Sequence, residues 1–234
     1  MTYTDLFIDF DDTLYDTHGN ANLALHELYE HFGLDRYFDN EQGFTEPYWL
    51  ANIQLWTQYS RGEITRDYLI VERFRRPLSV GMGERVTKEF CLEVSDWFLE
   101  SCADKPGVID GAHELLEHLR RKGYRMHMTS NGFHEVQYRK LKASATLEYF
   151  HTVILSEDAG VNKPDRRFFD YAFKVSGARP ESTLMIGDNF VTDIKGAKDA
   201  GLDVMFFNQH PDEFQAPEPV NYEVHHLSEI TKIL

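Results

Sequence analysis

The sequence is poor in cysteine and in basic residues, and each shortage excludes a class of protein. Two of the 234 residues are cysteines, Cys91 and Cys102, too few for the disulfide framework of a small secreted protein. We interpret both as buried free thiols. The 24 lysines and arginines are outnumbered by 39 acidic residues, which gives a formal net charge of −15. Because binding to a nucleic-acid backbone requires clustered basic residues, a nucleic-acid polymer is not expected as a partner.

Long apolar segments are missing as well. No apolar run reaches the roughly 20 residues that a membrane-spanning helix requires. Residues 1–5 also lack the basic start of a secretory signal peptide. We therefore expect a soluble, cytoplasmic protein that does not associate with a membrane and that is a monomer or a weak homo-oligomer.

Hydrophobic patterning divides the chain into two kinds of region. Apolar residues recur at helical spacing throughout residues 17–103, and no convincing strand interrupts them. From residue 104 onward, short apolar runs alternate with helical patterns, which predicts a parallel, doubly wound sheet. We predict an α/β fold in which residues 1–16 and 104–234 form a Rossmann-like core and residues 17–103 form an inserted all-helical domain.

The predicted core begins with an apolar strand that ends in three acids. Asp9, Asp11 and Asp12 follow the apolar residues 6–8 within four positions. Open α/β sheets bind their ligands at the carboxyl ends of the strands. Carboxylates crowded at such an end repel one another unless a cation lies among them, and Mg²⁺ fits best if a phosphate shares it. By itself the pattern is also consistent with an acidic turn.

The strands that follow end in further polar groups, which the parallel sheet would bring to the same edge. They are Ser130 and Asn131 after the predicted strand 124–129, Lys163 after 152–155, and Asp188 and Asp193 after 183–186. A hydroxyl, an amide turn, a lysine and separate acids suit phosphoryl transfer through a carboxylate nucleophile.

Each of these groups has an expected role in such a reaction. Asp9 would attack phosphorus and become an aspartyl-phosphate, while Asp11 would act as general acid and then as general base. Lys163 would neutralise charge on the transferring group. The Ser130 hydroxyl and the backbone N–H of Asn131 would bind phosphate oxygens.

The same edge of the sheet has the donors for Mg²⁺. The expected ligands are the Asp9 carboxylate, the backbone carbonyl of Asp11 and the Asp188 carboxylate. Asp193 is expected to orient Asp188 or metal-bound water instead of binding the metal directly.

These four elements, in this order, resemble the motifs of the haloacid dehalogenase (HAD) phosphatase superfamily. The matching segments are Asp9-Phe10-Asp11-Asp12-Thr13, Ser130, Lys163-Pro164 and Gly187-Asp188 with Thr192-Asp193. The resemblance implies a Rossmann-like core, a Mg²⁺ requirement and an α-helical cap between the first and second motifs. In two places the chain departs from the pattern, because many relatives carry Gly where Asp12 stands and Pro where Asp110 precedes Gly111.

Segments 55–65, 73–74, 130–133 and 154–164 are similar to the YjjG-type noncanonical pyrimidine 5′-nucleotidases. This resemblance implies a Mg²⁺-dependent phosphomonoesterase whose partner is a small phosphate ester, a pyrimidine nucleoside 5′-monophosphate. The alternatives are a phosphatase or phosphomutase acting on a small sugar phosphate or phosphoglycolate, and a catalytically silent phosphate-binding protein. A 2-haloacid dehalogenase is disfavoured, because its chemistry needs neither Asp11 nor a metal at Asp188.

Overall fold

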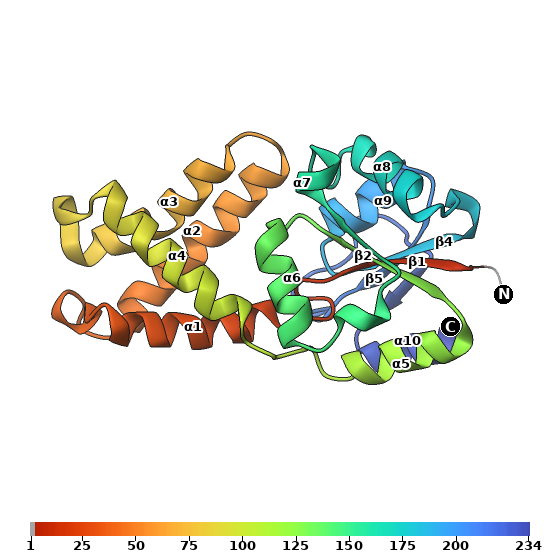
Figure 1. The fold of residues 1–234 in the computed structure, drawn as a ribbon, viewed down its shortest axis with the longest axis horizontal. Helices are drawn as coiled ribbons and strands as arrows, with labels where there is room; N and C mark the ends of the chain where they lie inside the picture. The colour runs from red at the N-terminus through yellow and green to blue at the C-terminus, as the bar shows by residue number, and fades with distance from the viewer. Residues whose placement is uncertain (1–2) are drawn as a thin grey trace. The chain divides into compact units, whose positions relative to one another are not determined.

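The computed structural model describes residues 3–234, and the chain divides into two compact units. The core unit comprises Met1–Thr17 and Pro106–Leu234, and the helical unit comprises His18–Lys105 (Figure 1). The sequence pattern had placed these boundaries after residues 16 and 103. Each unit has its own hydrophobic core and is described by itself.

The core unit is built on a six-stranded sheet in which all paired strands run parallel. Its order is β3-β2-β1-β4-β5-β6, so β1 lies in the middle, paired with β2 and β4. The strands are β1 (Asp5–Asp9), β2 (Arg125–Ser130), β3 (Thr152–Leu155), β4 (Thr183–Gly187), β5 (Asp203–Phe207) and β6 (Tyr222–Val224). The predicted Rossmann-like α/β fold is confirmed.

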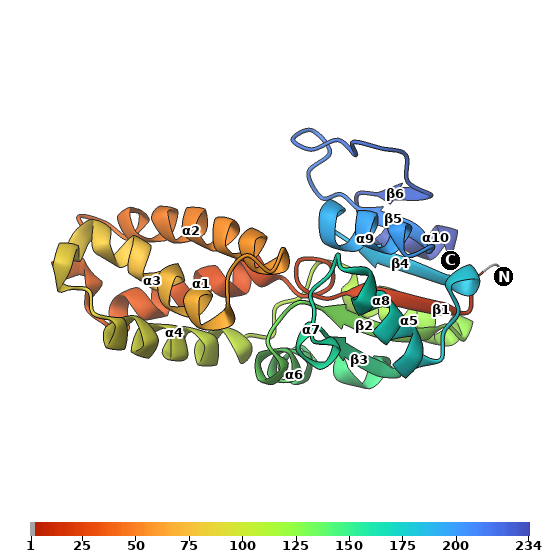
Figure 2. The same cartoon turned by 90° about the horizontal axis from the view of Figure 1, so that it is seen from above.

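Helices cover both faces of this sheet, as the apolar character of β1 requires (Figures 1 and 2). Because side chains alternate along a strand, Leu6 and Ile8 face one side and Phe7 the other. The cluster around Leu6 and Ile8 includes side chains of α5 (Ala112–Lys122), α6 (His134–Ala143) and α10 (Leu227–Ile233). The cluster around Phe7 includes side chains of α8 (Arg166–Ser176) and α9 (Gly196–Asp199). A one-turn helix, α7 (Ser156–Ala159), follows β3.

The helical unit packs four long helices around its own core. They are α1 (Thr17–His31), α2 (Gln42–Ser60), α3 (Arg66–Met82) and α4 (Lys88–Ala103). Threonines cap two of them: the Thr65 hydroxyl accepts from the Tyr68 N–H at 3.3 Å and the Thr87 hydroxyl from the Phe90 N–H at 3.1 Å. Among residues 3–234, no helix is long and apolar enough to cross a membrane.

Helical periodicity predicts a helix over 192–200, and the structure divides this segment between a π-helical turn, η5 (Phe190–Lys195), and the short α9. The Asn189 side chain caps the start of this turn, because it accepts from the N–H groups of Val191 and Thr192, both at 3.1 Å. Asp193 therefore projects from a widened turn, a feature that is frequent at functional sites.

Candidate active site

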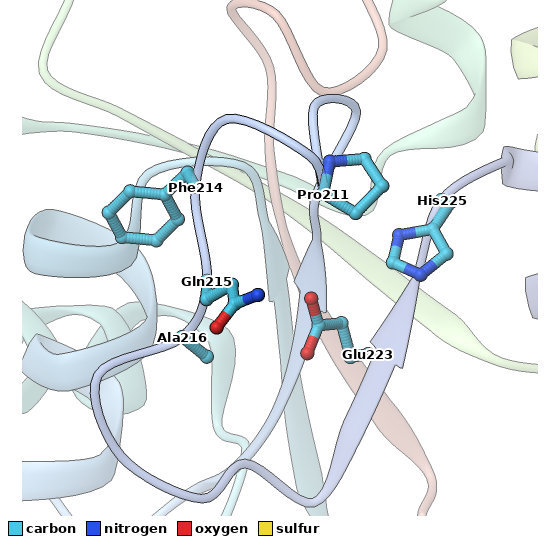
Figure 3. A pocket seen from close by; sticks show the side chains of 6 residues that line it. All are labelled: Pro211, Phe214, Gln215, Ala216, Glu223 and His225. Atoms are coloured by element: carbon cyan, nitrogen blue, oxygen red, sulfur yellow. The ribbon is translucent and has the colours of Figure 1, made fainter.

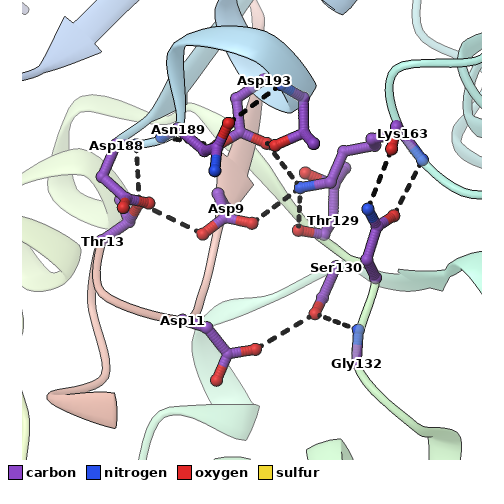
Figure 4. A network of polar contacts seen from close by, with 12 residues as sticks. Asp9, Asp11, Thr13, Thr129, Ser130, Gly132, Lys163, Asp188, Asn189 and Asp193 are labelled. Carbon is purple, nitrogen blue, oxygen red and sulfur yellow. Dashed lines mark hydrogen bonds and ion pairs between the residues drawn. The ribbon is translucent and has the colours of Figure 1, made fainter. Parts of the chain in front are cut away.

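Three carboxylates from two adjacent strand ends lie together in the middle of the sheet (Figure 4). Asp9 is the last residue of β1, Asp188 directly follows β4, and Asp193 lies on η5. One oxygen of each lies within 4.8 Å of the other two. Gly187 makes room for this arrangement, since a Cβ there would lie 2.5 Å from an Asp193 oxygen. The parallel pairing of β1 and β4 thus brings Asp9 and Asp188, which are 179 positions apart in the sequence, into one cluster.

Lys163 provides the positive charge inside this cluster. Its side chain is 1% exposed, and Nζ lies 2.6 Å from Asp9 Oδ1 and 2.8 Å from Asp193 Oδ1. Nζ also donates to the Thr129 carbonyl at 3.1 Å. The three ammonium protons therefore have three acceptors, which is what a buried lysine needs.

The pKa values of the cluster reflect its burial and its excess of negative charge. Burial and the neighbouring carboxylates raise the pKa of Asp9 to about 8, although the Lys163 ammonium opposes that shift. Burial together with the charges of Asp9 and Asp193 raises the pKa of Asp188 well above its usual range. Burial lowers the pKa of Lys163, but the stronger combined effect of Asp193 and Asp9 raises it, so the lysine stays charged.

Thr13 connects two of the acids. Its hydroxyl lies 3.2 Å from Asp9 Oδ2 and 3.0 Å from Asp188 Oδ1, and it accepts from the Asp188 N–H at 3.1 Å. It stands within the first acidic motif, so the sequence contained the residue, although no role was assigned to it. Thr13 therefore holds the carboxylates of Asp9 and Asp188 at a defined distance from each other.

The donor set fits a hard divalent cation. Both Asp193 oxygens are already engaged, Oδ1 by Lys163 and Oδ2 by the Asn189 N–H at 3.1 Å. One oxygen of Asp9 and one of Asp188 contact the same Thr13 hydroxyl. The raised pKa values of both acids show that their negative charges are not fully compensated, and a bound cation would compensate them. Oxygen-only donors of this kind suit Mg²⁺.

Asp11 lies beside this cluster and not within it. Its side chain is about one-quarter exposed, and each oxygen receives two donors. The donors are Thr17 Oγ1 and Lys140 Nζ to Oδ1, at 3.0 and 2.6 Å, and Ser130 Oγ and Gln137 Nε2 to Oδ2. Burial raises the pKa of Asp11, but the Lys140 ammonium and the hydrogen bonds outweigh it and lower the pKa overall. Sequence reasoning missed both Gln137 and Lys140.

Ser130 is the last residue of β2 and Asn131 follows it; both were expected to bind phosphate. Ser130 Oγ lies 3.3 Å from Asp11 Oδ2 and accepts from the Gly132 N–H at 2.9 Å. The Asn131 side chain holds Lys163 in place, because it donates to the Lys163 carbonyl at 2.9 Å and accepts from the Lys163 N–H at 2.8 Å. This support was not foreseen, and phosphate binding by the Asn131 backbone N–H stays a prediction.

The acidic turn itself has an unusual backbone. Asp12 has φ +60°, the left-handed region that favours glycine and that aspartate tolerates better than most residues. Gln209 Nε2 donates to the Asp12 carbonyl at 2.8 Å. Asp12 thus adopts a backbone conformation that glycine would also adopt.

A separate pocket in the core unit does not carry these groups (Figure 3). It lies between the loop after β5 and strand β6, and it is lined by Pro211, Phe214, Gln215, Ala216, Glu223 and His225. Two of its polar side chains bind the loop after β5: Glu223 accepts from Asn208 Nδ2 at 2.8 Å, and His225 Nδ1 lies 2.9 Å from the Asn208 carbonyl. We therefore place the candidate site at the carboxylate cluster.

Comparison with known proteins agrees with this geometry. The family model of the haloacid dehalogenase-like hydrolases matches residues 6–201, which include every residue of the cluster. The chain belongs to this HAD family. The HAD-hydrolase YfnB of Bacillus subtilis is 32% identical over 99% of this chain and 95% of its own length. A crystal structure of YfnB bound to magnesium has a TM-score of 0.86 at 29% identity and covers 100% of this chain and 99% of that one.

Other HAD relatives carry names that state an activity. Pyrimidine 5′-nucleotidase PynA of Streptococcus pneumoniae is 29% identical over 100% of this chain and 96% of its own. Pyrimidine 5′-nucleotidase YjjG of Escherichia coli is 30% identical over 100% of this chain and 99% of its own length. Glyceraldehyde 3-phosphate phosphatase of Methanothermobacter thermautotrophicus is 30% identical over 87% of this chain and 84% of its own length. This HAD hydrolase thus has both nucleotidase and sugar-phosphate phosphatase relatives.

Proposed function

We propose that this HAD hydrolase is a phosphomonoesterase that hydrolyses pyrimidine nucleoside 5′-monophosphates through an aspartyl-phosphate at Asp9. The observation that carries the proposal is the pairing of the Asp9 carboxylate with Lys163 Nζ at 2.6 Å, beside Asp188 and two residues before Asp11. A buried carboxylate nucleophile needs cationic neighbours before an anionic phosphate can approach it, and Lys163 is one such neighbour.

The chain's own residues divide the reaction between them. Asp9 attacks phosphorus as the ester P–O bond breaks. Because its lowered pKa leaves Asp11 ionised in the free protein, Asp11 takes up a proton from the bound phosphate monoanion and passes it to the leaving oxygen. Asp11 then takes a proton from the attacking water and gives it up with the released phosphate, so that both aspartates return to their starting states. Lys163 and the Ser130 hydroxyl stabilise the charge on the transferring group.

A magnesium ion held by Asp9, Asp188 and the Asp11 carbonyl would supply further positive charge to the phosphate. The support for it is the crowding of Asp9, Asp188 and Asp193, whose repulsion a divalent cation relieves. Asp193, paired with Lys163, is assigned a supporting role in the same arrangement.

The substrate class is supported by PynA and YjjG, which match this chain over its whole length, helical unit included. The matching glyceraldehyde 3-phosphate phosphatase favours a second candidate, a small sugar phosphate. A phosphate-release screen with millimolar Mg²⁺ separates them: uridine, deoxyuridine and cytidine monophosphates against adenosine monophosphate, glyceraldehyde 3-phosphate and phosphoglycolate. We expect the pyrimidine nucleotides to have the highest kcat/KM and EDTA to abolish turnover. A preference for glyceraldehyde 3-phosphate would replace the nucleotide proposal.

A further inference from the structure

Two buried polar side chains of α6 converge on the Asp11 carboxylate, and neither belongs to the four motifs that characterise the family. Gln137 is 1% exposed and Lys140 is 6% exposed. They are three positions apart, so both project from the same face of the helix. Lys140 Nζ lies 2.6 Å from Asp11 Oδ1, and Gln137 Nε2 donates to Asp11 Oδ2.

Burying these groups has a cost that ordinary helix packing does not explain. A lysine ammonium is expensive to take out of water unless it is paired, and long side chains lose rotamer freedom when they are fixed. Lys140 is compensated by Asp11 and by the Tyr15 ring, whose centroid lies 4.9 Å from Nζ. This face of α6 therefore places two donors on a single carboxylate.

The turn before α6 is shaped to admit Gln137. A Cβ at Gly132 would lie 1.8 Å from Gln137 Nε2 and 2.7 Å from its Cδ. Any side chain at position 132 would thus occupy the space that the glutamine amide fills. Ser130, two residues earlier, and Thr17 are the other two donors to Asp11.

We propose that Gln137 and Lys140 are positioning residues that hold the Asp11 carboxyl group in the orientation required for proton transfer to the leaving group. This inference rests on the proposed function. In the step concerned, the bond between an Asp9 oxygen and phosphorus forms, the ester P–O bond breaks, and a proton that Asp11 has taken up from the bound phosphate monoanion ends on the departing alcohol. A misdirected Asp11 slows this step without removing the nucleophile.

Comparing two substrates with different leaving groups distinguishes a positioning role from a general loss of structure. p-Nitrophenolate departs as a stable anion and needs little protonation, whereas the 5′-oxygen of a nucleoside must leave as an alcohol. kcat/KM reports the steps through the first phosphoryl transfer, so it isolates this half of the reaction. The variants are Lys140→Met and Gln137→Met, with Lys142→Met as the control because Lys142 is an exposed lysine on the same helix.

We expect each variant to lower kcat/KM for uridine monophosphate about 10²-fold and for p-nitrophenyl phosphate by less than about threefold. Lys142→Met changes neither value. In an Asp11→Asn background, Lys140→Met should cause no further loss with the nucleotide, since it acts through Asp11. Equal losses with both esters, no loss with either, or additive losses in the double variant would each overturn the inference.

The proposed function can fail separately. If the wild type hydrolyses p-nitrophenyl phosphate and a sugar phosphate but no nucleotide, the substrate proposal is wrong, and the same comparison decides the inference with the sugar phosphate as the alkyl ester. If the wild type hydrolyses no phosphate ester, the phosphatase proposal and the inference are both overturned.

Discussion

Replacing Lys163 with methionine tests how the carboxylate cluster is held together. Its ammonium lies 2.6 Å from Asp9 and 2.8 Å from Asp193 and is almost completely buried. Removing one partner of a buried ion pair costs about 3–5 kcal/mol, because the remaining charge stays buried without compensation. One kcal/mol corresponds to about 2–4 °C in a chain of this size, so the melting temperature should fall by about 6–20 °C.

The assay is thermal melting at neutral pH in EDTA, with Lys174→Met as the control because Lys174 is an exposed lysine of α8. The control should melt within about 2 °C of the wild type, as surface substitutions usually do. Adding Mg²⁺ should raise the melting temperature of Lys163→Met more than that of the wild type, because the ion supplies the charge that the lysine no longer provides. A Lys163→Met protein that melts with the wild type in EDTA would refute this account of the cluster.

Three further predictions concern stability. Burial, only partly offset by Asp5, holds the pKa of His127 below its usual value, so the unfolded chain binds a proton that the native state does not. The free energy of unfolding should therefore rise with pH from the native pKa to about 6.5, and His127→Gln should flatten the rise in pH-dependent urea melts. Thr87→Ala removes the cap of α4 and should lower the free energy of unfolding by about 1 kcal/mol in the same melts; an unchanged midpoint argues against the cap. Gly187→Ala places a Cβ 2.5 Å from Asp193, so it should lower both the melting temperature and phosphatase turnover, and wild-type values for both would contradict the packing.

Much of the core unit was predictable because its strands are short, apolar and bounded by clear turns. The predicted strands 152–155 and 183–186 correspond to β3 and β4 of the structure. The π-helical turn at η5 was not predictable, because helical periodicity does not distinguish a π-turn from an α-turn over six residues. The Asn189 side chain caps this turn through two hydrogen bonds, and capping of this kind is equally common in α-helices.

The candidate site shows the same limit. Parallel strand order explains why Asp9, Lys163 and Asp188, far apart in the sequence, lie in one cluster. Gln137 and Lys140 gave no such signal, since glutamine and lysine are ordinary residues of a solvated helix face. The spacing of three between them, after a turn containing glycine, was the one available hint, and it is common in helices that bind nothing.

Covalent phosphorylation of Asp9 is the measurement that tests the central claim most directly. Enzyme is mixed with uridine monophosphate and Mg²⁺, quenched in acid within milliseconds and digested. The masses of the resulting peptides are then measured by mass spectrometry. The account predicts one acid-stable, base-labile phosphoryl group on the peptide that contains Asp9, and none in Asp9→Asn. Turnover by Asp9→Asn at the wild-type rate, or a phosphoryl group found on another residue, would contradict it.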